Sequence, residues 1–141
     1  SMSPLTRRLL EGVDVLDAAD RRRRNFELLD ELLLPRGLRR IEGEAPVAPF
    51  AWPLITDRTA CHGDFHAAGV YAPVLWSDVR GRTRPDDPER WAVDHVVPLP
   101  VDHHLVTADI EELARRVLAV MQTFDDPSTV NEVARDRADV Q

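Results

Sequence analysis

Lysine is missing from this sequence of 141 residues, because all 18 of its basic side chains are arginines. No side chain here can therefore act as an amine nucleophile or form an internal Schiff base. A single cysteine, Cys61, cannot make an internal disulfide, which agrees with a reducing cytoplasm. No stretch approaches the roughly 18 consecutive apolar residues of a membrane-spanning helix, so we expect no membrane partner.

Positive charge is also scarce. The 18 basic side chains face 25 acidic ones, which gives a net charge of −7. The one dense basic run, from Arg21 to Arg24, lies in a predicted helix and so spreads around its circumference. Because phosphate binding needs a positive surface, we expect no nucleic-acid partner. The composition, 43% hydrophobic and 30% charged, is typical of a globular domain with a single modest core.

Helical patterns occupy the N-terminal part of the chain. Ser3 and Pro4 form a typical helix start and predict a short first helix. Asp14 begins a longer helix, which Pro35 and Gly37 should stop. Spacings of three and four residues predict an apolar stripe along it, formed by Leu16, Ala19, Phe26, Leu29 and Leu33.

Three short extended segments are predicted at residues 47–56, 70–76 and 96–100. Pro49 and Pro53 cannot donate to a strand ladder, so the first segment should be an edge strand or start irregularly.

The other segments complete the predicted order. A short helix should lie between the first two strands and end at Gly69, and residues 77–90 should form a loop. Thr107 caps the last helix, whose buried stripe is Ile110, Leu113, Val117 and Met121.

This order predicts an α+β fold. We expect a two-layer small domain with a short, mainly antiparallel three-stranded sheet, helices on one face and a long N-terminal linking helix. Residues 3–40 would be the linking helices and residues 46–122 the α+β small domain. Residues 123–141 would be a polar tail that could form a further short helix.

Three stretches of the sequence, in this order and spacing, are similar to one known family. The first holds Arg22, Arg23, Arg24, Asn25, Phe26 and Leu29; the second is residues 68–76 (Ala-Gly-Val-Tyr-Ala-Pro-Val-Leu-Trp); the third runs through residues 97–100, Asp102, His103 and His104 to Asp109 and Ile110. Together they resemble the C-terminal small domain of the DegT family of fold-type I, pyridoxal-phosphate-dependent sugar aminotransferases. The resemblance covers residues 3–122.

The resemblance implies a role without catalysis for this chain alone. In the family a large domain, absent from this sequence, supplies the Schiff-base lysine, the acidic partner of the pyridine nitrogen and most phosphate contacts. Pyridoxal phosphate is therefore implied for the parent or partner only, and no catalytic or cofactor-binding residue is assigned here. The chain would be one half of a split enzyme or a fragment of one.

Partners follow from the same resemblance. We expect a cognate large-domain polypeptide or a second copy of this chain to cover the apolar stripe defined above. The alternative is a stand-alone, non-catalytic remnant that binds a partner protein or a small ligand in a biosynthetic or regulatory complex.

Five residues are candidates to line a substrate site or an interdomain cleft. Tyr71 and Trp76 lie on opposite faces of one predicted strand, so one of them should be core and the other free to line a cleft. His103 and His104 occupy the turn before the last helix, which lies near the interdomain cleft in the family. Arg58 could contact an anionic substrate.

Two other groupings suggest independent chemistry. Cys61, His62, Asp64 and His66 are ligand types, and the two histidines are four residues apart on a predicted helix. Cys61 should project away from that face, and no second ligand pair has zinc spacing, so we expect no metal site.

Asp-His sequences at residues 94–95 and 102–104 suggest a general base, but no nucleophile motif accompanies them. An independent metal- or histidine-dependent enzyme is the third hypothesis.

Overall fold

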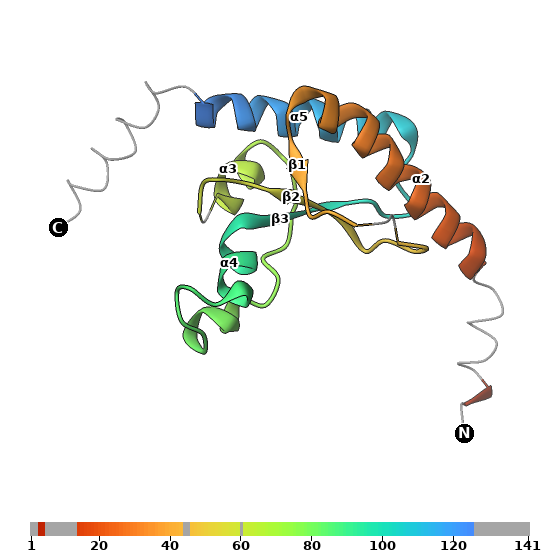
Figure 1. Cartoon of the computed structure of the whole chain (residues 1–141). Coiled ribbons are helices and arrows are strands. Elements are labelled where there is room, and N and C mark those ends of the chain that lie inside the picture. Colours follow the sequence, from red (N-terminus) through yellow and green to blue (C-terminus); the bar gives the residue numbers. More distant parts are fainter. Residues whose placement is uncertain (1–2, 5–13, 44–45, 60, 126–141) are drawn as a thin grey trace.

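The computed structural model of this protein describes residues 3–4, 14–43, 46–59 and 61–125. Its elements, in chain order, are α2 (Val15–Leu33), η1 (Leu34–Arg36), β1 (Arg39–Arg40), β2 (Ala51–Ile55), α3 (His62–Ala67), η2 (Ser77–Gly81), α4 (Pro88–His95), β3 (Val96–Pro100) and α5 (Thr107–Asp125). The strands form an antiparallel sheet in the order β1-β2-β3 (Figure 1). The predicted α+β class with a three-stranded antiparallel sheet is confirmed.

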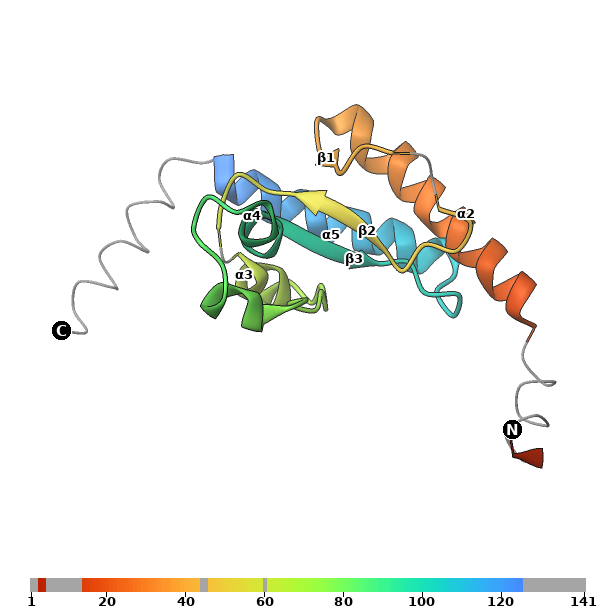
Figure 2. The ribbon, with the colours of Figure 1, turned by 60° about the horizontal axis from the view of Figure 1, so that its bottom comes forward.

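One face of the sheet carries the core. The two long helices, α2 and α5, lie on this face, and α4 lies on the other side (Figures 1 and 2). Four strand side chains point into the core: Trp52, Leu54, Val97 and Leu99. Their main partners from the helices are Phe26, Leu29, Leu33, Phe65, Ile110 and Val117. The linking helix and the small domain therefore share one core.

The long N-terminal helix begins and ends as the sequence predicts. The Asp14 carboxylate accepts a hydrogen bond from the Asp17 N–H at 3.0 Å, as an N-cap does. A short 3-10 turn containing Pro35 follows, and Gly37 ends it with φ of 85°, a conformation that favours glycine.

Burial along this helix corrects the expected interface. Phe26, Leu29 and Leu33 are at most 2% exposed, so they lie in the core of this chain and not on a surface free for a partner. Leu16, by contrast, is 78% exposed, and Ala19 is half-buried.

Prolines are compatible with β2 and β3 because their nitrogens point away from the hydrogen bonds that join these two strands. The Thr56 N–H donates to the His95 carbonyl, and the register then puts Pro53 opposite Pro98 as a pair without mutual hydrogen bonds. The nitrogen of Pro53 faces β1, and those of Pro98 and Pro100 face the outer edge of β3. No proline nitrogen lies where the β2–β3 ladder needs a donor. Of the two expectations for residues 47–56, the edge strand is wrong, because β2 is the middle strand, and the irregular start is confirmed, because the strand begins only at Ala51.

Residues 70–76 do not form the predicted strand. Val70 and Ala72 are buried and Tyr71 is exposed, which imitates a strand pattern. The Val70 N–H, however, donates to the Phe65 carbonyl, and the Ala72 N–H donates to the Val70 carbonyl. With these donors used locally, the segment joins no ladder in the described part of the chain. The third strand is instead β1, at the end of the range expected to hold the linking helices.

A helix that the sequence analysis missed lies in the expected 77–90 loop and beyond it. α4 has Asp87 at its N-cap position and Pro88 as its first residue, a pair that signals a helix start. The predicted short helix of residues 3–10 falls almost wholly outside the described residues, as does the tail from 126 to 141. Among the described helices, none combines the length and the apolar character that a membrane crossing requires.

The Asp30 carboxylate joins α2 to both β1 and β2. Its Oδ1 accepts from Trp52 Nε1 at 2.7 Å and from Arg40 Nε at 2.7 Å, and its Oδ2 accepts from Arg40 Nη2 at 3.0 Å. The two charged side chains are mostly buried, and the Arg40 guanidinium lies 5.0 Å from the centre of the Phe26 ring. Charge-assisted, bidentate bonds of this kind are among the stronger ones in proteins.

Substitution of Asp30 tests this role, since it would leave the Arg40 charge and the Trp52 N–H buried without their acceptor. We expect Asp30→Ala to lower the free energy of unfolding by about 3 kcal/mol. The control is Asp57→Ala, which removes the pair with Arg39, the other arginine of β1, where both side chains are exposed. It should cost less than about 1 kcal/mol. Urea denaturation measures both, and equal losses would contradict the role given to Asp30.

Candidate functional site

The face of the sheet opposite α2 and α5 is hollowed into an apolar groove. The cavity there has a volume of about 250 Å³. We call it the open-face groove, and its lining is Ile41, Phe50, Ala51, Pro53, Leu75, Trp76, Ala92, Val93, Val96 and Pro98. Phe50 and Trp76 are 67% and 68% exposed, so large apolar surface lies open to water at this groove.

A second cavity, of about 150 Å³, continues the groove toward α2. It shares Phe50, Ala51 and Pro98 with the first and ends at Arg22 and Asp102. The Arg22 guanidinium donates to Asp102 Oδ2 at 3.2 Å. The groove is thus apolar along its length and closed at one end by an ion pair.

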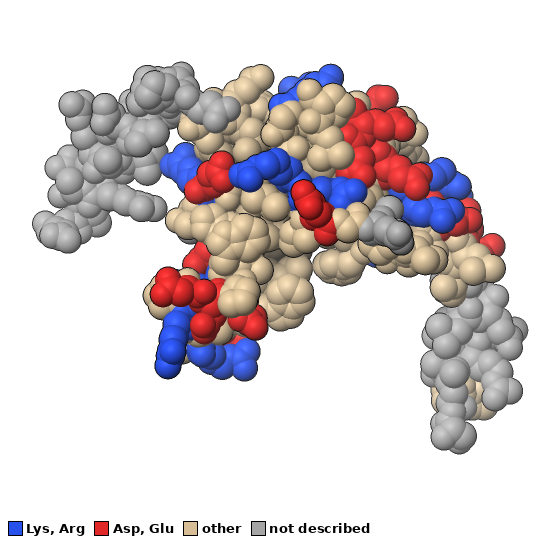
Figure 3. Space-filling view, in the orientation of Figure 1, with Lys and Arg blue, Asp and Glu red and all other residues tan. Residues whose placement is uncertain are grey.

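Charged side chains lie in patches on the side of the molecule that Figure 3 shows. In the view of Figure 3, charged side chains gather over α2, in a band across the middle of the molecule and around η2 and α4. The surface between the middle band and α4 is mostly uncharged.

Trp76 is held at the groove in an unusual backbone conformation. Its φ of 51° and ψ of 41° lie in the left-handed region, and it is the one non-glycine residue with positive φ in the described ranges. A bulky L-residue is strained there, and such strain is concentrated at functional sites. With the backbone in this conformation, the exposed indole of Trp76 lines the groove.

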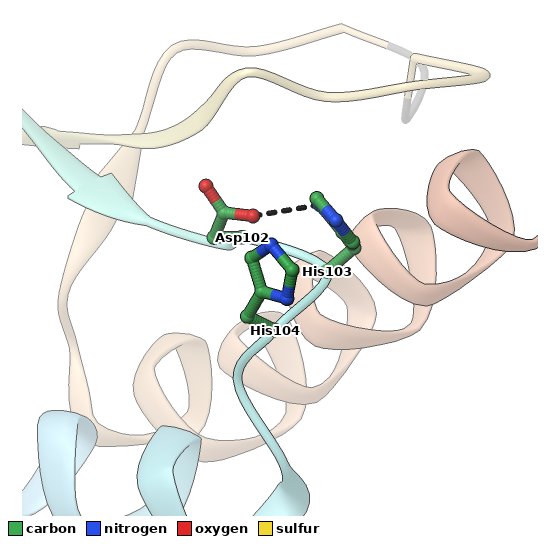
Figure 4. Close-up of side chains that lie close together, drawn as sticks. All are labelled: Asp102, His103 and His104. Atoms are coloured by element: carbon green, nitrogen blue, oxygen red, sulfur yellow. Dashed lines mark ion pairs between the residues drawn. The ribbon is translucent and has the colours of Figure 1, made fainter. Parts of the chain in front are cut away.

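Three chemistry-bearing residues come together in the turn between β3 and α5. Their potential ligand atoms lie within 4.8 Å of one another in Asp102, His103 and His104 (Figure 4). His103 Nδ1 is 2.8 Å from Asp102 Oδ1, and the two imidazole centres are 3.8 Å apart. Asn25, from α2, fixes the turn by donating to the carbonyls of Asp102 and Leu105.

The Asp102 carboxyl is held ionised. Partial burial alone would raise its pKa, but the nearby Arg22 guanidinium and hydrogen bonds from the His104 and His103 backbone, with the charge of His103, lower the pKa below its usual value. The turn therefore carries a carboxylate at neutral pH.

The five predicted site residues do not converge on one point. Trp76 lines the groove, and His103 and His104 lie in the turn beside Asp102, which borders the groove's polar end. The Arg58 guanidinium lies 4.8 Å from the centre of the Phe124 ring, and the Tyr71 ring packs edge-on against His66. Trp76 is thus the predicted residue that the structure places in the groove itself.

The groove residues that sequence reasoning missed left a recognisable signal. Ala51 and Pro53 alternate with the core residues of β2, yet they are not polar. A strand that is apolar on both faces is expected to be covered on both. In the described chain, α4 covers this second face only at one end.

The ligand-type residues around Cys61, where no metal site was expected, are not among the described groups close enough to share an ion. Cys61 is 1% exposed, and burial raises the pKa of its thiol, which the hydrogen bond with Thr56 only partly offsets. Burial, together with the charges of Arg80 and His66, lowers the pKa of His62. Within the described residues, the one group of three or more such side chains close enough to share a metal is in the 102–104 turn.

The Asp94–His95 pair has structural partners. Asp94 accepts from Arg80 at 2.8 Å and from Arg90 at 2.5 Å, which ties η2 to α4. His95 Nδ1 lies 2.9 Å from the Thr56 carbonyl oxygen. Asp94 is thus engaged by two arginines, and His95 uses one ring nitrogen to bond the backbone.

Pyridoxal phosphate does not fit this chain's own site. The chain has no lysine for the Schiff base, and the groove lining offers hydrocarbon where the phosphate and pyridine nitrogen need polar partners. If the cofactor takes part in this protein's function, another domain must hold it.

Because Trp76 has a positive φ, we expect glycine to be more stable than alanine at this position, the reverse of the usual order. Relief of the left-handed conformation is worth about 1–2 kcal/mol, so we expect Trp76→Gly to be about 1 kcal/mol more stable than Trp76→Ala. The matched control is Tyr71, which is 73% exposed and has no positive φ. There the glycine variant should be the less stable one by about 0.5 kcal/mol. Thermal melts of the four variants provide the comparison, and the same sign at both positions would rule out strain at Trp76.

Comparisons with known proteins add no relative to this picture. Searches of protein-family models, of curated proteins and of solved structures found no match to this chain. The resemblance to the DegT family therefore depends on the three sequence stretches described above. A function must be argued from the groove, the turn and the missing lysine.

Proposed function

We propose that this chain is the non-catalytic small-domain module of a DegT-type, pyridoxal-phosphate-dependent sugar aminotransferase, and that it docks a cognate large domain through the open-face groove. The large domain could be a separate polypeptide or part of a longer chain. The observation that carries the proposal is the groove, because it is apolar throughout and has two exposed aromatic rings at its surface.

The energetics of the groove favour a protein partner. Burying a side chain of the size of phenylalanine contributes about 1.5–3 kcal/mol. Phe50 and Trp76 are about two-thirds exposed, so most of this free energy is still to be gained when a partner covers them. Aromatic anchors surrounded by polar groups are the usual centres of protein interfaces.

The absence of lysine from this chain indicates what its partner must supply. A transaminase needs a lysine for its cofactor, and this chain has none. The three stretches similar to the DegT small domain point to a lysine-bearing large domain as the complementary part. On this view the present chain contributes cleft surface, and the partner holds the cofactor.

A second candidate is a stand-alone module that binds a small apolar ligand. The cavity of about 250 Å³ favours it, since that volume approaches the size of small-molecule pockets. The two candidates differ in what covers Phe50 and Trp76. A protein partner would cover both rings together with the surface around them, and a small ligand would leave the rim exposed.

Charged substitutions in the groove test the docking surface. We expect Phe50→Asp with Trp76→Asp to weaken binding of a purified DegT-type large domain at least about tenfold, because each carboxylate would have to be desolvated. The matched control is Leu16→Asp with Val106→Asp, two residues that are 78% and 60% exposed outside the groove. The control should bind like the wild type in calorimetric titration.

Self-association gives an independent readout of the same surface. Without its partner, the wild type should dimerise at high concentration in sedimentation experiments, and the groove variant should not. If the control variant loses the dimer and the groove variant keeps it, the interface lies on α2 and not at the groove. A monomeric wild type that also fails to bind the large domain would end the proposal.

The cofactor side of the proposal has its own test. Incubation of the isolated chain with pyridoxal phosphate, followed by borohydride reduction and intact-mass measurement, should show no stoichiometric adduct except at the N-terminal amine. The large domain in the same experiment should carry one adduct on a lysine. An internal adduct on the present chain would contradict the proposal that only the large domain holds the cofactor.

A further inference from the structure

We propose that a pocket between β1 and α4 binds a small planar aromatic carboxylate, with its ring against Trp91 and its carboxylate on Arg39. The pocket has a volume of about 570 Å³, which lies in the range of small-molecule sites. It shares Ile41 with the open-face groove, but its two recognition residues lie outside the groove lining. The site therefore does not depend on an aminotransferase partner.

The register of the sheet brings the two recognition residues to the same pocket. Arg39 pairs with Ile55 across the β1–β2 ladder, and paired residues carry their side chains on the same face. Ile55 alternates with the core residue Leu54, so this pair lies on the face opposite the core. Because α4 lies on that side of the sheet, its Trp91 lines the same pocket as Arg39 and Ile55.

Apolar side chains around the pocket are open to water. Leu34, Ile41 and Trp91 all line it, and each is 40% exposed or more. The Trp91 ring stacks on His95, with the ring centres 5.6 Å apart, and His95 Nδ1 lies 2.9 Å from the Thr56 carbonyl oxygen. The indole is thus held in place while part of its surface stays exposed. A flat aromatic ring that covers it would bury apolar surface that this chain leaves open.

The Arg39 guanidinium has donors available for an anion. It is 62% exposed, and of the described residues only Asp57 bonds it, with Oδ1 2.7 Å from Nη2. An arginine side chain has five N–H donors and can hold a carboxylate with two parallel bonds, whereas Asp57 accepts only one. Asp57 is almost fully exposed, and a pair of this kind contributes little to stability, so a ligand can replace it.

The charges around the pocket favour a ligand with a single negative charge. The charge of Arg40, which also lines the pocket, is compensated by Asp30, so Arg39 is the cation left for a ligand. Glu42 in the lining and the nearby Asp57 would repel a doubly charged phosphate. A carboxylate has one charge and the planar, two-oxygen geometry that a guanidinium binds best, so it is the better match.

A chemical-shift titration of the full chain with cinnamate tests the proposal, and the neutral cinnamamide is the matched ligand. The indole N–H signal of Trp91, assigned with Trp91→Phe, should shift on addition of cinnamate, and the signal of Trp76 should not. We expect cinnamamide to bind at least about tenfold more weakly, because it cannot form the charged pair with Arg39. This comparison uses the wild type alone and does not depend on the folding of any variant.

Two arginine variants locate the anion site. Arg39→Gln should weaken cinnamate binding at least about tenfold. The matched control is Arg82→Gln, which removes an arginine that is similarly exposed and also paired with one aspartate, Asp78, outside the pocket. It should bind like the wild type. Asp57→Ala should bind cinnamate at least as tightly as the wild type, because Asp57 competes for the same guanidinium.

Each opposite result overturns the site. Absence of cinnamate binding, equal binding of cinnamate and cinnamamide, or a shift at Trp76 in place of Trp91 would each do so. Equal losses in the two arginine variants, or weaker binding by Asp57→Ala, would also contradict the proposal.

Discussion

The Asp30 carboxylate is the acceptor on which the arrangement of helix and sheet depends. It binds Arg40 of β1 and Trp52 of β2 from the last turn of α2, so one side chain contacts both strands and ties three elements together. β1 has only two residues and could not hold its place by ladder bonds alone. With Arg40 anchored, the next residue, Ile41, donates its N–H to the Pro53 carbonyl and reaches the groove. A contact on the core face of the sheet thus positions a residue that lines the groove on the opposite face.

A second set of contacts from α2 joins segments that are far apart in the sequence. Arg22 and Asn25, in the first similar stretch, bond Asp102 and Leu105, in or beside the third. Segments about 80 residues apart in sequence are therefore in direct contact. These contacts are structural and do not by themselves assign an activity. They do bring the polar end of the groove and the histidine turn to the same end of the sheet.

Local signals in the sequence predicted much of the fold. Asp14, Pro35 and Gly37 delimit α2 because capping and chain stops are short-range effects. The segment around Tyr71 was mistaken for a strand because burial alternates there, whereas its N–H groups are used by the preceding turn. The groove could not be predicted, since it forms between residues far apart in sequence. Likewise the sequence placed an apolar stripe on α2 but could not say that this chain's own core would cover Phe26, Leu29 and Leu33.

The prolines of β3 restrict how anything can approach this sheet. Along its outer edge the positions that face away from β2 are Val96, Pro98 and Pro100. The prolines have no N–H, and that of Val96 already donates to the Ala92 carbonyl in α4. An incoming strand would find carbonyl acceptors along β3 but no free donor, and the opposite edge, β1, is two residues long. Growth of the sheet by strand addition, whether by a peptide ligand or by an aggregating copy, is therefore disfavoured. Recognition is directed to the face of the sheet, where contacts depend on shape and apolar surface instead of backbone pairing.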